Sequence, residues 1–273
     1  MSPSDEERVN QYLRSIVREI LQEWDGWRAR QQPFHLANHD VDPDATKRYL
    51  LVFGMACQAH EAAKGYLVAL NRAPVAATPV ARSCFELGMT AQWTAQVSDA
   101  WAAIANRNLW NDKALADSLA ESEEPENRKA GEVLQSKIAA NDYQELPTNS
   151  SAPVRYFNQL CDDLEGAKEY YLTYKVLSRE SHPGVFSGNA WFVPSKDGTQ
   201  MRMQYAPTVP HQGWLHIVAC SLIWAESAVD HLDRDHERKA RLEEVAASIK
   251  CSVIFHPTKE AKDRVQGIVK KSK

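Results

Sequence analysis

The chain has 273 residues, of which 44% are hydrophobic and 25% are charged, and its net charge is −4. This length supports a substantial core, and the composition is ordinary for a soluble globular protein. Neither the charge nor the composition favours a general nucleic-acid binder. The longest apolar stretch, residues 214–225, is shorter than the roughly 20 residues of a bilayer-spanning helix. We therefore expect a buried helix there and no membrane partner.

The cysteines indicate a reducing compartment. The chain has five of them, an odd number, and no two have C-x-x-C spacing. The N-terminus, M-S-P-S-D-E-E-R, is polar and acidic and lacks the pattern of a secretory signal. We expect reduced thiols and a cytoplasmic protein.

Apolar residues recur at helical spacing along most of the chain. In the first segment, Leu13, Ile16, Ile20 and Trp24 form one apolar stripe. Residues 78–97 are apolar nearly all round, which is typical of a helix at the centre of a bundle. The patterns predict helices over residues 4–27, 43–70, 78–97, 98–121, 125–140, 154–163, 167–181, 211–233 and 235–249. The fold class is therefore all-α, a multi-helix bundle.

One short segment reads as β-structure. Residues 190–205, A-W-F-V-P-S-K-D-G-T-Q-M-R-M-Q-Y, resemble a β-hairpin with Asp197 and Gly198 in the turn. Pairing Phe192 with Met203 brings several apolar side chains to one face: Phe192, Met201, Met203 and Tyr205. Because the hairpin follows the helix that ends near His182, it is a candidate lid over the end of the bundle.

We expect a single helical domain over residues 1–273, with its core at about 42–235. An amphipathic helix and a basic tail then occupy residues 236–273. From Arg234 to Lys273 there are 11 Lys and Arg residues against 6 Asp and Glu residues. A solvated tail is the simpler interpretation, and contact with nucleic acid or acidic lipid is the alternative.

The sequence contains no P-loop, G-x-G-x-x-G, G-x-S-x-G or H-E-x-x-H pattern. Two clusters have residue types that bind metals: His35, His39, Asp40, Asp42 and Asp44, and the stretch D-H-L-D-R-D-H-E at 230–237. The first lacks the glycine and the terminal glutamate of a calcium loop, and the second suits a solvated helix end. We therefore expect no metal and no cofactor.

The strongest site candidates are polar residues on helices that should line the core. We name His182, Arg82 and Glu86 as candidate catalytic residues, and His60, Tyr174, Ser178 and Arg179 as candidate ligand-binding residues. Buried ionisable groups are often parts of sites. They are also often structural, and His60 alone is more typical of a hydrogen-bonded core histidine.

The spacing of these residues predicts a pocket. Arg82 and Glu86 are four residues apart and share a helix face, as do Tyr174 and Ser178. Pro183 disfavours helical geometry for His182, which should therefore be the first residue beyond its helix. We expect His182 at the rim of the pocket, with Arg82 and Glu86 forming the opposite wall. The alternative is that His182 only bonds the last carbonyls of its helix.

Two short motifs carry a resemblance to known proteins. Arg82-Ser83-Cys84-Phe85-Glu86 matches R-[ST]-x-x-E, and Tyr174 to His182 matches Y-x-x-L-S-x-x-x-H. Over roughly residues 45 to 235 the chain resembles a bacterial all-helical family of unknown function that carries these motifs. That family is itself similar to HEPN domains, helical bundles that include RNA-cleaving toxins and defence effectors with R-x(4–6)-H. The resemblance implies His182 as general acid or base and Arg82 or Arg179 as the group that stabilises charge on the phosphate.

Three classes of function remain open. The first is a non-catalytic helical module that binds a ligand or a partner through its polar pocket, in a bacterial defence or stress setting. The second is a metal-independent, HEPN-like ribonuclease or toxin, although the net charge does not indicate RNA. The third is homo-oligomerisation, which eight tryptophans and several long apolar helices favour.

Overall fold

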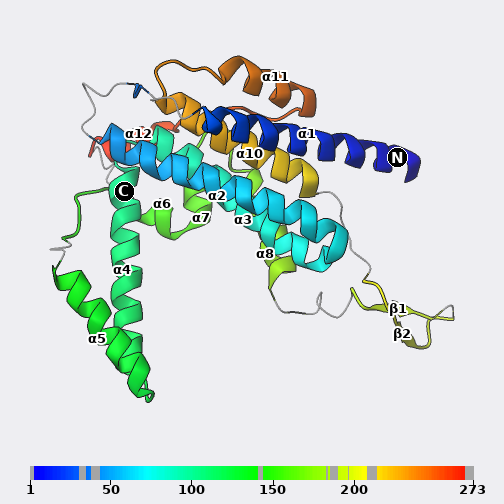
Figure 1. The fold of residues 1–273 in the computed structure, drawn as a ribbon, viewed down its shortest axis with the longest axis horizontal. Coiled ribbons are helices and arrows are strands. Elements are labelled where there is room, and N and C mark those ends of the chain that lie inside the picture. Colours follow the sequence, from blue (N-terminus) through cyan, green and yellow to red (C-terminus); the bar gives the residue numbers. More distant parts are fainter. Residues whose placement is uncertain are drawn as a thin grey trace, which may run out of the picture.

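The computed structural model describes residues 3–30, 35–37, 44–140, 144–182, 184, 190–195, 197–207 and 214–267. The fold is an all-α bundle with one small hairpin, so the predicted class is confirmed (Figure 1). The helices are α1 (Pro3–Ala29), α2 (Ala45–Arg72), α3 (Pro74–Gln96), α4 (Ala100–Ala120), α5 (Pro125–Ala140), α6 (Ser151–Arg155), α7 (Phe157–Asp162), α8 (Tyr170–Ser181), α10 (Trp214–Leu232), α11 (Lys239–Ile249) and α12 (Lys259–Val265). The strands are β1 (Phe192–Pro194) and β2 (Met201–Met203).

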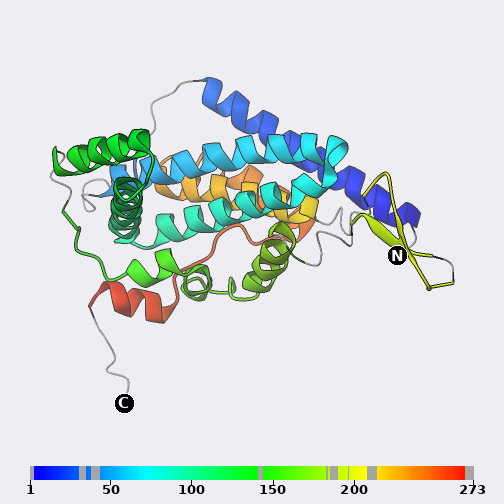
Figure 2. The ribbon, with the colours of Figure 1, turned by 90° about the horizontal axis from the view of Figure 1, so that it is seen from below.

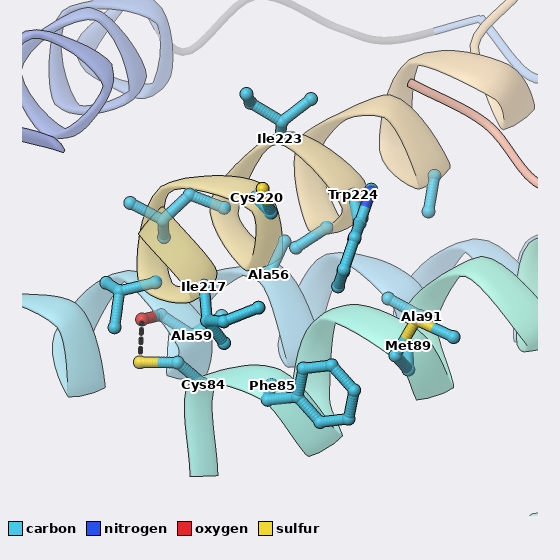
Figure 3. Packing of buried hydrophobic residues seen from close by; sticks show 14 of the residues in the cluster. Ala56, Ala59, Cys84, Phe85, Met89, Ala91, Ile217, Cys220, Ile223 and Trp224 are labelled. Atoms are coloured by element: carbon cyan, nitrogen blue, oxygen red, sulfur yellow. Dashed lines mark hydrogen bonds between the residues drawn. The ribbon is translucent and has the colours of Figure 1, made fainter. Parts of the chain in front are cut away.

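Helices α2, α3 and α10 form the centre of the bundle. Every residue of α10 from Ile217 to Asp230 is buried, which explains why this segment is apolar on all sides. Figure 3 shows Phe85 and Met89 of α3 close to Trp224 of α10. These side chains belong to one continuous hydrophobic cluster that joins the three helices.

Small residues let these helices approach closely. A Cβ atom on Gly88 of α3 would lie 2.6 Å from the backbone oxygen of Ser221 on α10, closer than van der Waals contact. Helices α2 and α3 are joined through Ala73 alone, and Pro74 occupies the first turn of α3, where a missing N–H costs no helical hydrogen bond. Because the link is one residue long, α2 and α3 pack as an antiparallel pair.

Helices α4 and α5 form an arm that extends away from the bundle (Figure 1). Most of α5 is exposed, and Gly131 is its one buried residue among those described. A Cβ atom on Gly131 would lie 2.9 Å from the backbone nitrogen of Ala120 and 3.0 Å from the oxygen of Ala116. A glycine at this crossing allows the two helices of the arm to pack.

The C-terminal segment packs on the bundle instead of leaving it as a tail. Gln92 of α3 accepts a hydrogen bond from Phe255 N at 3.1 Å, and Phe255 is buried against Trp224. Arg264 of α12 forms a two-pronged ion pair with Asp163, which also accepts from Trp93 Nε1 at 2.8 Å.

The expected core limits of about 42–235 are therefore too narrow. The same hydrophobic cluster includes Trp24 of α1 and Phe255. The predicted amphipathic helix in 236–273 is present as α11, but the part of the expected basic tail up to residue 267 is largely ordered structure that contacts α3 and α10. Residues 268–273 lie outside the described residues.

The predicted hairpin is present with the predicted register. Phe192 pairs with Met203 and Pro194 pairs with Met201. The expectation that it covers the end of the bundle is wrong, because Figure 1 shows it apart from the helices, and its overlap with the N-terminal end of α1 in Figure 2 is one of projection. Among the helices of the described residues, none has the length and apolarity needed for a bilayer crossing.

Candidate functional site

Arg82 is the centre of a polar cluster between α3 and α8. Its Nε donates to Glu86 Oε1 at 3.0 Å, one turn further along α3, as the four-residue spacing predicts. The side chain of Arg82 is 21% exposed and that of Glu86 is 37% exposed, so the pair is accessible from one side. The carboxylate balances the guanidinium charge within a partly desolvated environment.

Helix α8 and the residue after it supply the other members of the cluster, Tyr174 and His182. Arg82 Nη2 donates to the Tyr174 hydroxyl oxygen at 3.1 Å, and Arg82 Nη1 lies 2.9 Å from His182 Nε2. The guanidinium also lies 5.2 Å from the centre of the Tyr174 ring. The structure brings Arg82 and His182 into direct contact, whereas the sequence predicts them on opposite walls of a pocket.

The donor character of arginine assigns the tautomer of His182. A guanidinium N–H can only donate, so Nε2 of His182 must be the unprotonated acceptor, and the hydrogen of the neutral ring is on Nδ1. His182 has extended backbone geometry (φ −98°, ψ 148°) and lies just beyond α8, as Pro183 predicts. Its own N–H donates to Ser178 O at 3.2 Å, so the backbone caps the helix while the ring is turned toward Arg82.

Aromatic packing holds Tyr174 in place. Its ring lies 4.5 Å from that of Phe157 and 5.7 Å from that of Tyr171, and Phe157 in turn lies 5.8 Å from Phe85 in the core. Leu177 anchors the same helix as a fully buried residue. The Tyr174 hydroxyl is thus carried on a rigid element, which suits a preformed site.

The remaining α8 candidates lie beside the cluster. Ser178 is half-buried, one turn from both Tyr174 and His182, and its carbonyl receives the His182 N–H. Arg179 is exposed. The arginine that contacts His182 is Arg82 of another helix, so the short Arg179–His182 spacing does not define the pair.

His60 belongs to a different network, and the structure does not bring it to Arg82. Its ring is fully buried, with Nδ1 2.6 Å from Ala56 O and Nε2 2.6 Å from Glu226 Oε1. It stacks on Trp24 at 4.5 Å, and Glu226 also forms an ion pair with Arg238. This is the hydrogen-bonded core histidine that the sequence indicates as the more typical interpretation of His60.

Sequence reasoning missed Glu226 and Arg238. The available signal was Glu226, an acidic residue within the largely apolar α10, because a buried carboxylate requires a partner. Gln92 is likewise a polar residue in the largely apolar α3, where burial requires a hydrogen-bond partner. Its Nε2 donates to Trp224 O at 2.7 Å.

The two clusters with metal-binding residue types meet in space. His35 Nδ1 lies 2.8 Å from Asp235 Oδ2, and Asp230 Oδ1 accepts from Arg238 N at 3.0 Å beyond the end of α10. Within the described residues, no three His, Cys, Asp or Glu side chains are arranged to hold a metal ion. His39, Asp40 and Asp42 lie outside the described residues.

A separate groove of about 690 Å³ lies along α4. Its lining is Trp101, Ala105, Asn106, Asn108, Leu109, Asp112, Gln144 and Leu146. The amide of Asn106 bonds both N and O of Leu146 at 2.8 Å and fixes one wall. None of the residues predicted to form the site lines this groove.

The chain matches no protein-family model, and comparisons with curated proteins and with solved structures also found no match.

Proposed function

We propose that this chain is a non-catalytic helical binding module that holds an anionic oxygen group, such as a phosphoryl or carboxylate group, at the Arg82 cluster. The observation that supports it is the contact of one guanidinium with Glu86, Tyr174 and His182 at 2.9–3.1 Å. A single arginine thereby joins groups from two helices at a partly exposed position.

Hydrogen-bond direction favours an anionic ligand. The Tyr174 oxygen accepts from Arg82, so its own hydroxyl hydrogen is directed to another acceptor. His182 Nε2 also accepts from Arg82, so its Nδ1–H is a second donor. The guanidinium has five N–H groups, and those not directed at Glu86, Tyr174 and His182 can donate to a carboxylate or phosphate oxygen, the groups for which arginine is the best-suited side chain.

The free cysteines support a cytoplasmic location for this module. All five cysteines are free, and two of them, Cys57 and Cys251, are partly exposed. Exposed free thiols persist in a reducing compartment. A bacterial defence or stress setting rests on the family resemblance of the two motifs alone.

A titration with inorganic phosphate tests this function. Backbone amide resonances of α3 and α8 should shift saturably with phosphate in the wild type and much less in Arg82→Gln. Arg18→Gln on α1, an equal loss of charge on another helix, is the matched control and should bind like the wild type. Equal saturable shifts in Arg82→Gln and the wild type, or no saturable shift in the wild type, would exclude a phosphate site at Arg82. Sodium acetate in parallel reports whether carboxylate is preferred.

The second candidate is a metal-independent ribonuclease of the HEPN kind. The contact of His182 Nε2 with Arg82 at 2.9 Å supports it, because such a reaction uses an acid–base histidine and an arginine at the phosphate. In that reaction the ribose 2′-oxygen loses its proton and attacks phosphorus, and the 5′-oxygen leaves with a proton.

Toxicity and RNA cleavage separate the two candidates. The ribonuclease arrests growth on expression and cleaves total RNA, and His182→Ala abolishes both effects. If the wild type and His182→Ala are equally harmless and neither cleaves total RNA, the ribonuclease fails and the binding module stands.

A further inference from the structure

The β-hairpin exposes an apolar face to solvent. In the register of Phe192 with Met203, alternate residues share a face, so this apolar face consists of Phe192, Pro194, Met201, Met203 and Tyr205. Met201 is 60% exposed, Met203 is 74% exposed and Tyr205 is fully exposed. Such large apolar side chains, grouped on one face, are typical of an interaction surface.

The hairpin has a well-formed turn. Ser195 N donates to Gln200 O at 2.8 Å, and Gly198, at φ +70°, adopts the left-handed conformation that a glycine permits. Gln204 N donates to Trp191 O at 2.8 Å and extends the ladder beyond the strands.

Two strands of three residues each are too short to be stable alone. A two-stranded sheet in water is marginal unless its apolar face packs against another layer. In Figure 1 the hairpin lies apart from the helices, so the described helices of its own chain are not that layer. The described part of the chain leaves this face exposed, so a second molecule can supply the missing layer.

The chemistry of the face favours a second copy of this chain. The face carries no charged residue, and the charge on the strands is that of Arg202, which alternation places on the opposite face. A charged face would repel its own copy, whereas a neutral apolar face is complementary to itself about a two-fold axis. Sheets that pack face to face do so at about 10 Å with interdigitated side chains.

The size of the face sets the strength of the association. The face has two aromatic side chains, which bury about 150–250 Å² each, together with two methionines and a proline, so it buries on the order of 500 Å² per copy. A stable interface buries about 800 Å² per partner, so this contact is weak and depends on concentration.

We infer that two copies of this chain associate by packing the apolar faces of their hairpins against each other. This inference does not depend on the function of the Arg82 cluster.

Sedimentation velocity on the full chain from roughly 5 to 500 µM tests it, over the range where a weak dimer dissociates. The wild-type mass rises with concentration from 30.8 kDa toward twice that value. Met203→Glu introduces a charge on the apolar face and stays monomeric. Arg202→Glu changes the charge by more, on the opposite face, and associates like the wild type.

Far-UV circular dichroism verifies that the helices of both variants are intact. A wild type that stays monomeric over the whole range overturns the inference, including when it binds lipid vesicles instead. A dimer that Met203→Glu and Arg202→Glu weaken equally, or that neither weakens, also overturns it.

Discussion

Arg82 and His182 are one hundred residues apart in sequence, and Nη1 of the arginine lies 2.9 Å from Nε2 of the histidine. This contact joins α3 to the end of α8 and determines which ring nitrogen of His182 carries the hydrogen. With Nε2 accepting from Arg82, the Nδ1–H group of His182 is left as a hydrogen-bond donor.

The contact between Arg82 and the Tyr174 hydroxyl should appear as an energetic coupling. In a double-mutant cycle of Arg82→Gln and Tyr174→Phe, we expect a coupling free energy of about 0.5–1.5 kcal/mol by urea denaturation, the usual net value of one hydrogen bond. The cycle of Arg82→Gln with Tyr171→Phe is the control and should be additive. Equal coupling in both cycles contradicts a specific Arg82–Tyr174 bond.

Gly88 should be intolerant of a side chain. A Cβ atom there meets the Ser221 oxygen at 2.6 Å, so Gly88→Ala should destabilise the fold by about 1–3 kcal/mol. Gly65 on α2 is exposed, and a Cβ atom there would have no neighbour within 4 Å, so Gly65→Ala should be neutral or stabilising by up to about 1 kcal/mol. Thermal denaturation compares the two, and a Gly88→Ala as stable as Gly65→Ala disproves the close crossing of α3 and α10.

The ion pair of Asp163 with Arg264 should hold the C-terminal segment on the bundle. Asp163 is 7% exposed and bonds both Arg264 and Trp93, so Asp163→Asn should cost about 2–4 kcal/mol. Hydrogen exchange over residues 251–265 should accelerate. Asp162→Asn changes the exposed neighbouring carboxylate and should leave exchange unchanged. If residues 251–265 exchange as slowly in Asp163→Asn as in the wild type, contacts other than the ion pair hold this segment on the bundle.

His231 should contribute a small loss of stability in mild acid, small because its side chain is exposed and solvent screens its charge. Desolvation lowers the pKa of His231 below 6.5, and positive charge on His236, Arg48 and His256 lowers it further. The unfolded chain then binds a proton more readily than the folded chain, so this group's contribution to stability is lost as the pH falls from about 6.5 through the folded pKa.

Urea denaturation at about pH 7.5 and 5.5, on either side of the usual histidine pKa, measures this effect. The wild type should lose stability at the lower pH, and His231→Asn should lose less. If His231→Asn loses as much free energy of unfolding as the wild type between these pH values, other groups cause the acid sensitivity.

The helices and the hairpin register followed from periodicity and turn chemistry, because both are local. Phe192 pairs with Met203 since the turn around Gly198 and the alternation of apolar residues leave one good register. Likewise, Pro183 was enough to place His182 just beyond α8.

The long-range contacts did not follow from the sequence in the same way. Helical spacing put Arg82 and Glu86 on one face, but which helix lies opposite depends on packing across the whole chain. His60 was grouped with Arg82 because both have polar groups on buried helices. The partner that separates them, Glu226, lies 166 residues after His60. The position of the hairpin relative to the bundle also could not be predicted, because apolar alternation indicates an apolar face without indicating what packs on it.

The most direct test of the account is the protonated nitrogen of His182 in the free protein. Long-range proton–nitrogen correlation spectra of the histidine rings at neutral pH, with His182 assigned by comparison with His182→Gln, report which ring nitrogen carries hydrogen. We predict hydrogen on Nδ1, a bare Nε2 facing Arg82, and His182 ring resonances that shift when inorganic phosphate is added. Hydrogen on Nε2 alone would contradict the Arg82–His182 contact and, with it, the anion site built on it.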